Sequence, residues 1–286
     1  MMETLERVVP GPLQPVTGHW SRPILPMVLI LALAACMAFV GCSSKIARVE
    51  VSDEDLIKAN RLAQDGNEAY NDRDFYAALI KYLMAGELNP NSAYISNRIG
   101  MAYLQLEYNE QAIVAFKRAI ALNSKYPYFI NNLGSAYFAL GNLKKAEKYF
   151  KKAIKLKKDE ASFYLNLGTL HFEKKKTEQA FEEWRKSLSL DPDILSKNNT
   201  VDVAISGSGI SLKDRDFFMA RLYAVAGNTP KAIESLEKAL MNGFSDIESI
   251  ENTPEFDPIR DDERFVKFME SASVWAKAKY SNSTTE

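Results

Sequence analysis

The chain has 286 residues, and its 36 basic and 37 acidic residues give a formal net charge of −1. Because nucleic-acid-binding proteins usually carry a basic excess, this balance argues against a nucleic-acid partner. The two cysteines, Cys36 and Cys42, both lie near the N-terminus, so no internal disulfide framework can form. The only histidines are His19 and His171. The composition therefore predicts no metal, no cofactor and no Cys/His chemistry.

The N-terminal region contains an uncharged, largely apolar segment from Ile24 to Val40. Its 17 residues exceed the ~7–15 of a signal-peptide core and fall short of the ~20 of a membrane-spanning helix. The segment runs into Gly41-Cys42, which resembles the bacterial lipoprotein box, where the cysteine is acylated and becomes the mature N-terminus. An uncleaved signal anchor is the alternative.

The lipoprotein resemblance implies a signal peptide over residues 1–41, a lipid anchor with palmitate on Cys42, and a tether over residues 42–58 that leads into the first helix. Several acyl chains together give stable membrane anchoring. Ser43 follows the cysteine and resembles the residue that sorts such proteins to the outer membrane. We therefore expect a chain that is anchored in the cell outer membrane and faces the periplasm.

Residues 59–194 have an internal period of 34 residues without insertion. Glycine recurs at the eighth position of each repeat, alanine at the twentieth and an aromatic residue at the twenty-fourth. These residues are Gly66, Gly100, Gly134 and Gly168; Ala78, Ala112, Ala146 and Ala180; and Tyr82, Phe116, Phe150 and Trp184. A glycine inside a helix costs ~1 kcal/mol relative to alanine, so its repetition indicates that two helices cross closely there.

These signatures resemble the tetratricopeptide repeat, a helix-turn-helix unit. The resemblance implies an all-α, right-handed superhelical solenoid of about five repeats with a C-terminal capping helix. Four repeats occupy residues 59–194, a fifth occupies residues 213–246, and residues 247–286 form the cap and tail. The Gly- and Ser-containing segment 195–212 is expected to be an insertion loop, with a short strand near residues 201–205 as one interpretation.

In this family the first helix of each repeat lines the concave face and contacts the ligand. The corresponding positions hold mostly amides and aromatic rings, which suit an extended, apolar or amphipathic peptide. The predicted partner-binding residues are Gln64, Asn67, Tyr94, Asn97, Arg98, Tyr128, Asn131, Asn132, Phe138, Asn166 and Phe172. The alternative is that these asparagines and rings mainly fill space between repeats. The family's clamp for C-terminal carboxylates is not expected, because Ala63 and Tyr128 stand where it needs basic residues.

Charge is unevenly distributed, with eleven lysines and four acids between Asn142 and Lys176. Most of these lysines fall on second helices or turns, which indicates a solvated convex face; contact with anionic lipid or an acidic partner is the alternative. An enzyme is not predicted, because His171 occupies the eleventh position, where a tyrosine usually packs, and the mature chain offers no second histidine.

The sequence therefore predicts a membrane-anchored scaffold that binds a protein or extended peptide and assists the assembly of an envelope complex. It predicts no small-molecule substrate. A regulatory protein that docks an envelope protease or a peptidoglycan enzyme is the alternative.

Overall fold

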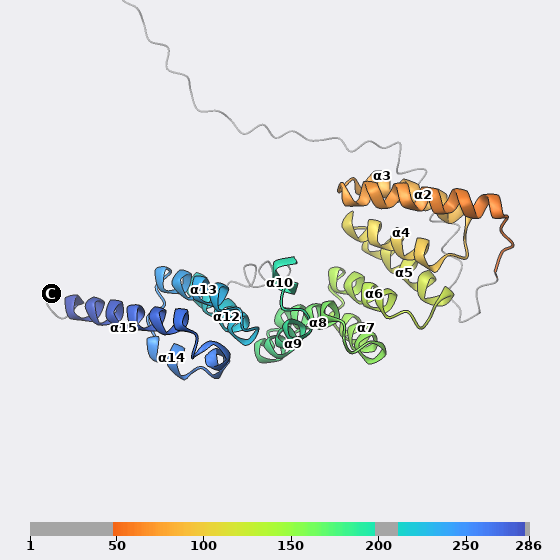
Figure 1. Ribbon diagram of the computed structural model, residues 1–286. Helices are drawn as coiled ribbons and strands as arrows, with labels where there is room; N and C mark the ends of the chain where they lie inside the picture. The colour runs from red at the N-terminus through yellow and green to blue at the C-terminus, as the bar shows by residue number, and fades with distance from the viewer. Residues whose placement is uncertain (1–47, 198–210, 284–286) are drawn as a thin grey trace, which may run out of the picture. The chain divides into compact units, whose positions relative to one another are not determined.

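The computed structural model describes residues 48–197 and 211–283, and its regular elements there are all helices (Figure 1). The predicted all-α fold of paired helix-turn-helix repeats is confirmed. The signal segment, Cys42 and the strand considered near residues 201–205 lie outside the described residues. Within the described part of the chain, no helix is long and apolar enough to cross a bilayer.

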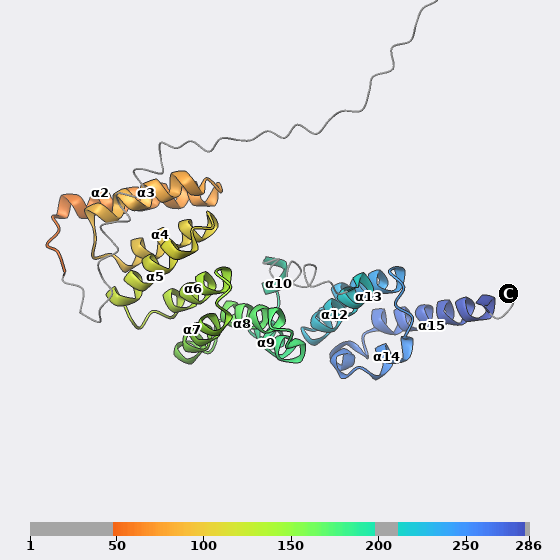
Figure 2. The ribbon, with the colours of Figure 1, turned by 180° about the vertical axis from the view of Figure 1, so that it is seen from behind.

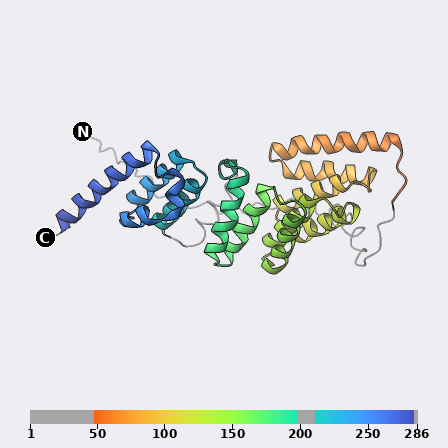
Figure 3. The same cartoon turned by 60° about the horizontal axis from the view of Figure 1, so that its bottom comes forward.

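Five antiparallel helix pairs form the array (Figures 2 and 3). The first four pairs are α2 (Asp53–Asn71) with α3 (Phe75–Leu88), α4 (Ala93–Gln105) with α5 (Asn109–Leu122), α6 (Pro127–Ala139) with α7 (Leu143–Leu156), and α8 (Ala161–Glu173) with α9 (Thr177–Leu190). The short α10 (Ile194–Lys197) follows, and the fifth pair is α12 (Leu212–Val225) with α13 (Thr229–Met241). The C-terminal elements are α14 (Ile247–Asn252), the 3-10 helix η1 (Pro254–Ile259) and α15 (Glu263–Ser283).

The eighth-position glycines allow the two helices of a pair to approach closely. A Cβ atom added to Gly134 would lie 2.7 Å from two ring carbons of Phe150, which stands at the twenty-fourth position on the partner helix. The same glycine–aromatic contact joins Gly66 to Tyr82 and Gly100 to Phe116 at 2.6 Å, and Gly168 faces Trp184. Real Cβ atoms do not come this close, so the predicted packing role of these glycines is confirmed.

The turn inside each pair has the same backbone conformation at the fifteenth position of the repeat and at its equivalent in the fifth pair. The residues there have positive φ angles of 60–76°: Arg73, Glu107, Gly141, Lys175 and Gly227. The amide of the next residue donates to a carbonyl five residues earlier, as Asn142 does to Tyr137 at 2.8 Å. This is a Schellman helix end, which normally favours glycine. Only two of the five turns have glycine, so the sequence pattern did not reveal this shared helix end.

Second helices end at the same register in all four repeats. They close at Leu88, Leu122, Leu156 and Leu190. Asn89 and Asp191, each followed by a proline, are the C-cap residues of α3 and α9. The two repeats that lack this proline end at the equivalent leucine as well.

The fifth pair packs on the fourth through Phe218 of α12. Its ring lies 5.6 Å from the ring of Phe181 and 5.8 Å from that of Trp184. Phe172 joins the same core and is only 4% exposed. The insertion between the fourth and fifth repeats therefore does not interrupt the packing of helix on helix.

The C-terminal elements cover the fifth pair, as a cap must in a stacked array. Phe256 and Ile259 of η1 and Phe265 of α15 are buried in one cluster with Ala220 and Leu236. Phe268 and Met269 pack against this cluster, and Ala272 is also buried. The predicted C-terminal capping helix therefore contacts the array through these residues.

Candidate binding surface of the first helices

First helices of consecutive repeats touch one another, α4 with α6 and α6 with α8. We call the solvent-facing side of α2, α4, α6 and α8 the inner surface. It carries the second, fifth, sixth, ninth and twelfth positions of each repeat, where the sequence predicted ligand contacts. Each of these side chains can therefore be placed from the contacts it makes.

Two asparagine pairs hold the first helices together. Asn132 Nδ2 donates to Asn97 Oδ1 at 2.9 Å, and Asn166 Nδ2 donates to Asn131 Oδ1 at 3.1 Å. In each pair the residue at the sixth position of one repeat reaches the fifth position of the repeat before it. The amides therefore bond across the repeat boundary, which the sequence did not distinguish from a ligand-facing row.

Three of the predicted contact residues are buried in the structure. Asn97 and Asn131 are only 7% and 6% exposed, and Phe172 lies in the core between the fourth and fifth pairs. A buried amide must be hydrogen-bonded, and the neighbouring asparagines satisfy this need. These three residues set the spacing of the helices and do not face solvent.

A polar and aromatic cluster lies where α2 meets α4. Asn67 Nδ2 donates to the hydroxyl of Tyr94 at 3.0 Å, and Asn67 Oδ1 accepts a hydrogen bond from Tyr82 at 2.9 Å. Arg98 Nε donates to the same Tyr94 hydroxyl at 3.0 Å, and its guanidinium carbon lies 5.1 Å from the centre of the Tyr94 ring. The Tyr94 side chain is 44% exposed, so this cluster is accessible.

Arg98 is a cation without a carboxylate partner. Within the described residues no acidic side chain lies within ion-pair distance of its guanidinium. Tyrosines surround it, and burial raises the pKa of Tyr82 to about 12 and also raises that of Tyr70. These hydroxyls therefore stay protonated at neutral pH and do not neutralise the arginine. The guanidinium is left to bind an acidic group or a carbonyl from outside.

The second tyrosine on the inner surface, Tyr128, is already engaged. Its hydroxyl donates to Glu160, and Lys157 Nζ donates to that hydroxyl at 2.7 Å. Lys157 also bonds Glu160 at 3.0 Å and lies over the Tyr128 ring. The carboxylate raises the pKa of Tyr128. This triad links the turn after α7 to α6, and its polar atoms are satisfied internally.

The remaining predicted residues keep groups that face solvent. Gln64 is exposed on α2, and Phe138 is half-buried at the end of α6. Asn132 and Asn166 are half-buried, and in the described chain no hydrogen bond reaches their Oδ1 atoms. The accessible part of the inner surface therefore combines amide acceptors, one arginine and aromatic rings.

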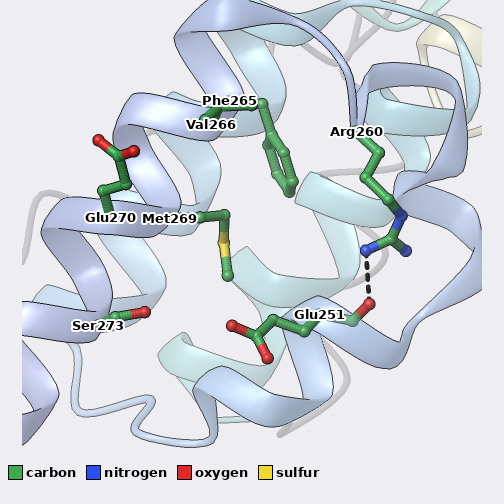
Figure 4. Close-up of a pocket in the computed structure, with 7 residues that line it drawn as sticks. All are labelled: Glu251, Arg260, Phe265, Val266, Met269, Glu270 and Ser273. Atoms are coloured by element: carbon green, nitrogen blue, oxygen red, sulfur yellow. Dashed lines mark hydrogen bonds between the residues drawn. The ribbon is translucent and has the colours of Figure 1, made fainter.

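The C-terminal cap contains a small pocket, which Figure 4 shows. Phe265, Val266 and Met269 of α15 form its apolar side, and Glu251 and Glu270 lie at its rim. Arg260 Nη1 donates to the backbone carbonyl of Glu251 at 2.6 Å and holds one wall in place. Because Phe265 and Met269 already pack against the fifth pair, we assign the pocket to the cap.

His171, which the sequence placed in the core, is only 5% exposed. Burial lowers the pKa of its imidazole, and Nε2 lies 3.8 Å from Glu147 Oε1. Glu147 instead accepts hydrogen bonds from Lys151 and Lys174, both at 2.6 Å. The described residues contain no group of three or more His, Cys, Asp or Glu side chains with the geometry of a metal site.

Comparison with known proteins agrees with the helix pairs described above. Tetratricopeptide-repeat family models match residues 127–160 and 161–194, and a TPR repeat model matches residues 102–141. A segment of 69 residues is 46% identical to the small glutamine-rich tetratricopeptide repeat-containing protein 2 of Mycosarcoma maydis. That match covers 24% of this chain and 19% of the relative, so it spans about a fifth of the relative's length.

Solved structures with similar folds include the first TPR of Spaghetti (RPAP3) bound to an HSP90 peptide. It is 22% identical with a TM-score of 0.41, and the match covers 44% of this chain and 98% of that one. MamA of Desulfovibrio magneticus RS-1 is 24% identical with a TM-score of 0.43, and the match covers 48% of this chain and 77% of that one. From the family models and the helix pairs together, residues 102–194 consist of tetratricopeptide repeats.

Proposed function

We propose that this protein is a membrane-tethered adaptor that binds an extended segment of another protein on the inner surface. The observation that carries the proposal is Arg98, a half-buried cation that has no acidic partner in the described structure and is held in place by Tyr94. A cation that is positioned by a tyrosine but not neutralised is prepared for a ligand. Structural packing alone would not need its charge.

The groups around Arg98 define what the segment must offer. The guanidinium fits a carboxylate or two backbone carbonyls, since its donors form a planar fork. The free Oδ1 atoms of Asn132 and Asn166 accept from backbone amides, which suits an extended chain whatever its side chains are. The rings of Tyr94 and Phe138 offer apolar contacts. We therefore expect an extended segment with an acidic or carbonyl group opposite Arg98 and an apolar side chain beside it.

The tether is the second part of the proposal, and it is supported by the sequence Gly41-Cys42 at the end of an apolar segment. An anchor at Cys42 would hold the repeats at the periplasmic side of an outer membrane and leave the inner surface available to a partner. Such a placement suits an adaptor that assists the assembly of an envelope complex. The protein itself performs no chemistry in this proposal.

Partner capture tests the binding surface. The tagged full-length protein is cross-linked in the membranes of cells that produce it, and the attached protein is identified by mass spectrometry. The variant Tyr94→Ala with Arg98→Ala removes the guanidinium that has no acidic partner and the tyrosine that positions it. The control Lys117→Ala with Lys155→Ala removes exposed lysines of second helices.

Loss of a group central to an interface often costs at least ~2 kcal/mol, so capture by the inner-surface variant should fall by more than tenfold. The lysine control should capture the partner as well as the wild type does. Circular dichroism must show that both variants are folded. Equal capture by the inner-surface variant would overturn the assignment of the binding surface.

Acyl labelling tests the tether separately. The variant Cys42→Ser should lose incorporation of radiolabelled palmitate and leave the lipoprotein fraction, because the only proposed acylation site is gone. Labelling that persists in this variant would show that the lipoprotein interpretation of the N-terminus is wrong.

A further inference from the structure

The second helices carry an outward-facing stripe whose chemistry changes from repeat to repeat. We define the outer stripe as the eighteenth, twenty-second and twenty-sixth positions of repeats one to three, on α3, α5 and α7. Its residues are Tyr76, Ile80 and Met84; Glu110, Val114 and Arg118; and Lys144, Lys148 and Lys152. Equivalent positions lie on the same face of the second helix in each repeat, so the repeats differ there in their residues.

The α3 part of the outer stripe is apolar and exposed. Tyr76 and Ile80 are both 52% exposed and Met84 is 45% exposed, and they follow one another at intervals of four residues along one helix face. On α5, Val114 at the twenty-second position is 41% exposed. Single exposed apolar residues are common on protein surfaces, but an aligned set on one face indicates contact with something apolar.

The α7 part of the outer stripe is basic and uncompensated. Lys144, Lys148 and Lys152 stand one above another at intervals of four residues, where like charges destabilise a helix. The only acid on α7 is Glu147, and its oxygens already accept from Lys151 and Lys174. Within the described residues, none of these three exposed lysines forms an ion pair.

The fourth repeat provides an internal comparison. Its residues at the same three positions are Glu178, Glu182 and Lys186, all exposed and neither apolar nor basic as a group. The apolar and basic character is therefore not a general property of second helices in this chain. The apolar character belongs to the first repeat and the basic character to the third.

We propose that the outer stripe lies against an anionic lipid bilayer, with the apolar residues of α3 entering the headgroup region and the lysines of α7 binding lipid phosphates. A surface that combines apolar and basic side chains is the chemistry by which amphipathic helices bind membranes. This inference rests on the proposed tether. Residues 43–52 can span at most about 35 Å, so an anchor at Cys42 would keep the first repeat close to the bilayer.

The consequence for function is orientation. The inner surface and the outer stripe are carried by different helices of each pair. Docking of the second helices on the bilayer would leave the first helices free to bind a protein. The tether would set the distance from the membrane, and the outer stripe would set which side of the array faces the partner.

Photo-crosslinking in reconstituted vesicles tests this orientation. The full-length protein carries the photoreactive residue benzoylphenylalanine in place of Ile80 or, as a control, in place of Gln64 on the inner surface. It is reconstituted into vesicles of phosphatidylethanolamine with phosphatidylglycerol, or of phosphatidylcholine alone. After irradiation, mass spectrometry measures the fraction of protein that carries a lipid adduct.

We expect at least tenfold more lipid adduct at residue 80 than at residue 64 on the vesicles with phosphatidylglycerol. Each lysine near an anionic surface strengthens binding by roughly fivefold, so Lys144→Glu with Lys148→Glu and Lys152→Glu should reduce the adduct at residue 80 at least tenfold. The matched control Lys125→Glu with Lys158→Glu and Lys176→Glu makes the same charge change at exposed turns and caps and should leave the adduct unchanged. On phosphatidylcholine vesicles, the protein without these lysine substitutions should give as little lipid adduct at residue 80 as the stripe variant gives on vesicles with phosphatidylglycerol.

Equal lipid adducts at residues 64 and 80, or no effect of the three stripe substitutions, would overturn the proposal. The same experiment in native membranes would overturn it if residue 80 became attached to a protein instead of a lipid. A carbonate wash distinguishes failure of the outer-stripe proposal from failure of the proposed anchor at Cys42. Release of the protein by carbonate would overturn the tether and the inference together, whereas retention without a lipid adduct at residue 80 would overturn the inference alone.

Discussion

The first four repeats and the fifth helix pair solve the same packing problem with different residues. In the third repeat, Gly134 faces Phe150, and a Cβ atom at the glycine would overlap the ring. In the fifth pair, Ala220 and Leu236 stand at the equivalent positions, and both side chains are fully buried. A smaller residue on the second helix therefore leaves room for a methyl group on the first.

The difference shows that these two positions are complementary in size and are not conserved in type. Protein interiors are close-packed, so one methyl group at a helix crossing has to be matched by space on the partner helix. Glycine facing an aromatic ring and alanine facing leucine both allow the two helices to pack, and this chain contains both combinations. Changing one member alone should therefore be costly, and changing both together should be tolerated better.

The largest expected effect comes from overfilling one crossing. Gly134→Leu forces a branched side chain against the ring of Phe150 and should lower the free energy of unfolding by about 3 kcal/mol. Lys117→Leu, at an exposed position of a second helix, is the control and should change stability by less than about 0.5 kcal/mol. Urea denaturation of the full-length protein in detergent, followed by circular dichroism, measures both. Similar shifts for the two variants would show that this crossing is not tightly packed.

A double-mutant cycle in the third repeat can introduce the alanine and leucine that stand at the equivalent positions of the fifth pair. Gly134→Ala and Phe150→Leu should each destabilise by about 1–2 kcal/mol, through the added clash and the lost ring volume respectively. The double variant should be more stable than their sum by about 1 kcal/mol, because the smaller leucine makes room for the methyl group. Strict additivity would contradict the size complementarity. In the fifth pair, the single reverse substitution Ala220→Gly should not increase the free energy of unfolding.

Ion pairs also join neighbouring helices, and the stability contributed by one of them should depend on pH. Glu147 joins α7 to α8 by accepting from Lys174, and Arg221 joins α12 to η1 through Glu255. Hydrogen bonds from Lys151 and Lys174 lower the pKa of Glu147 to about 2, from an ordinary value of 4.5. A carboxyl whose pKa is lower in the folded state stabilises the fold above its unfolded pKa and loses this contribution as pH falls toward the folded pKa.

Glu147→Gln should therefore destabilise the array by about 1 kcal/mol at pH 7, a value limited by solvent screening. The difference from the wild type should shrink as pH falls from about 4.5 toward 2, and urea midpoints over this range measure it. Glu87→Gln, at an exposed glutamate on α3, is the control for the removal of one surface carboxylate. A difference that stayed constant down to pH 2 would contradict the role of the Glu147 carboxylate.

The sequence was sufficient to predict the fold because its signals are local and repeated. Gly134, Ala146 and Phe150 recur at fixed spacing in each repeat, and that recurrence defines a helix pair without knowledge of its neighbours. The positive φ angles of Glu107 and Lys175 were not predictable, because the tertiary structure imposes them on residues that do not favour this conformation.

The candidate site was predicted only in part, for a related reason. The sequence placed Asn97 and Asn132 on the same surface, but whether an amide faces a ligand or a neighbouring helix depends on the spacing between repeats. In the structure these two residues bond each other, so Asn97 is buried while Asn132 keeps an exposed oxygen. The isolation of Arg98 also appeared only in three dimensions, since nearby acids in sequence do not reach it.

The central claim is that the inner surface, and not the outer stripe, binds the partner. It is tested most directly by the Kd of the captured partner's cross-linked segment for two variants that each remove one cation, Arg98→Ala from the inner surface and Lys148→Ala from the outer stripe. Fluorescence anisotropy of the labelled segment gives both values. Arg98→Ala should weaken binding by at least tenfold, because it removes a positioned guanidinium, and Lys148→Ala should leave the Kd within twofold of the wild type. A large loss in Lys148→Ala with normal binding by a folded Arg98→Ala protein would contradict the account.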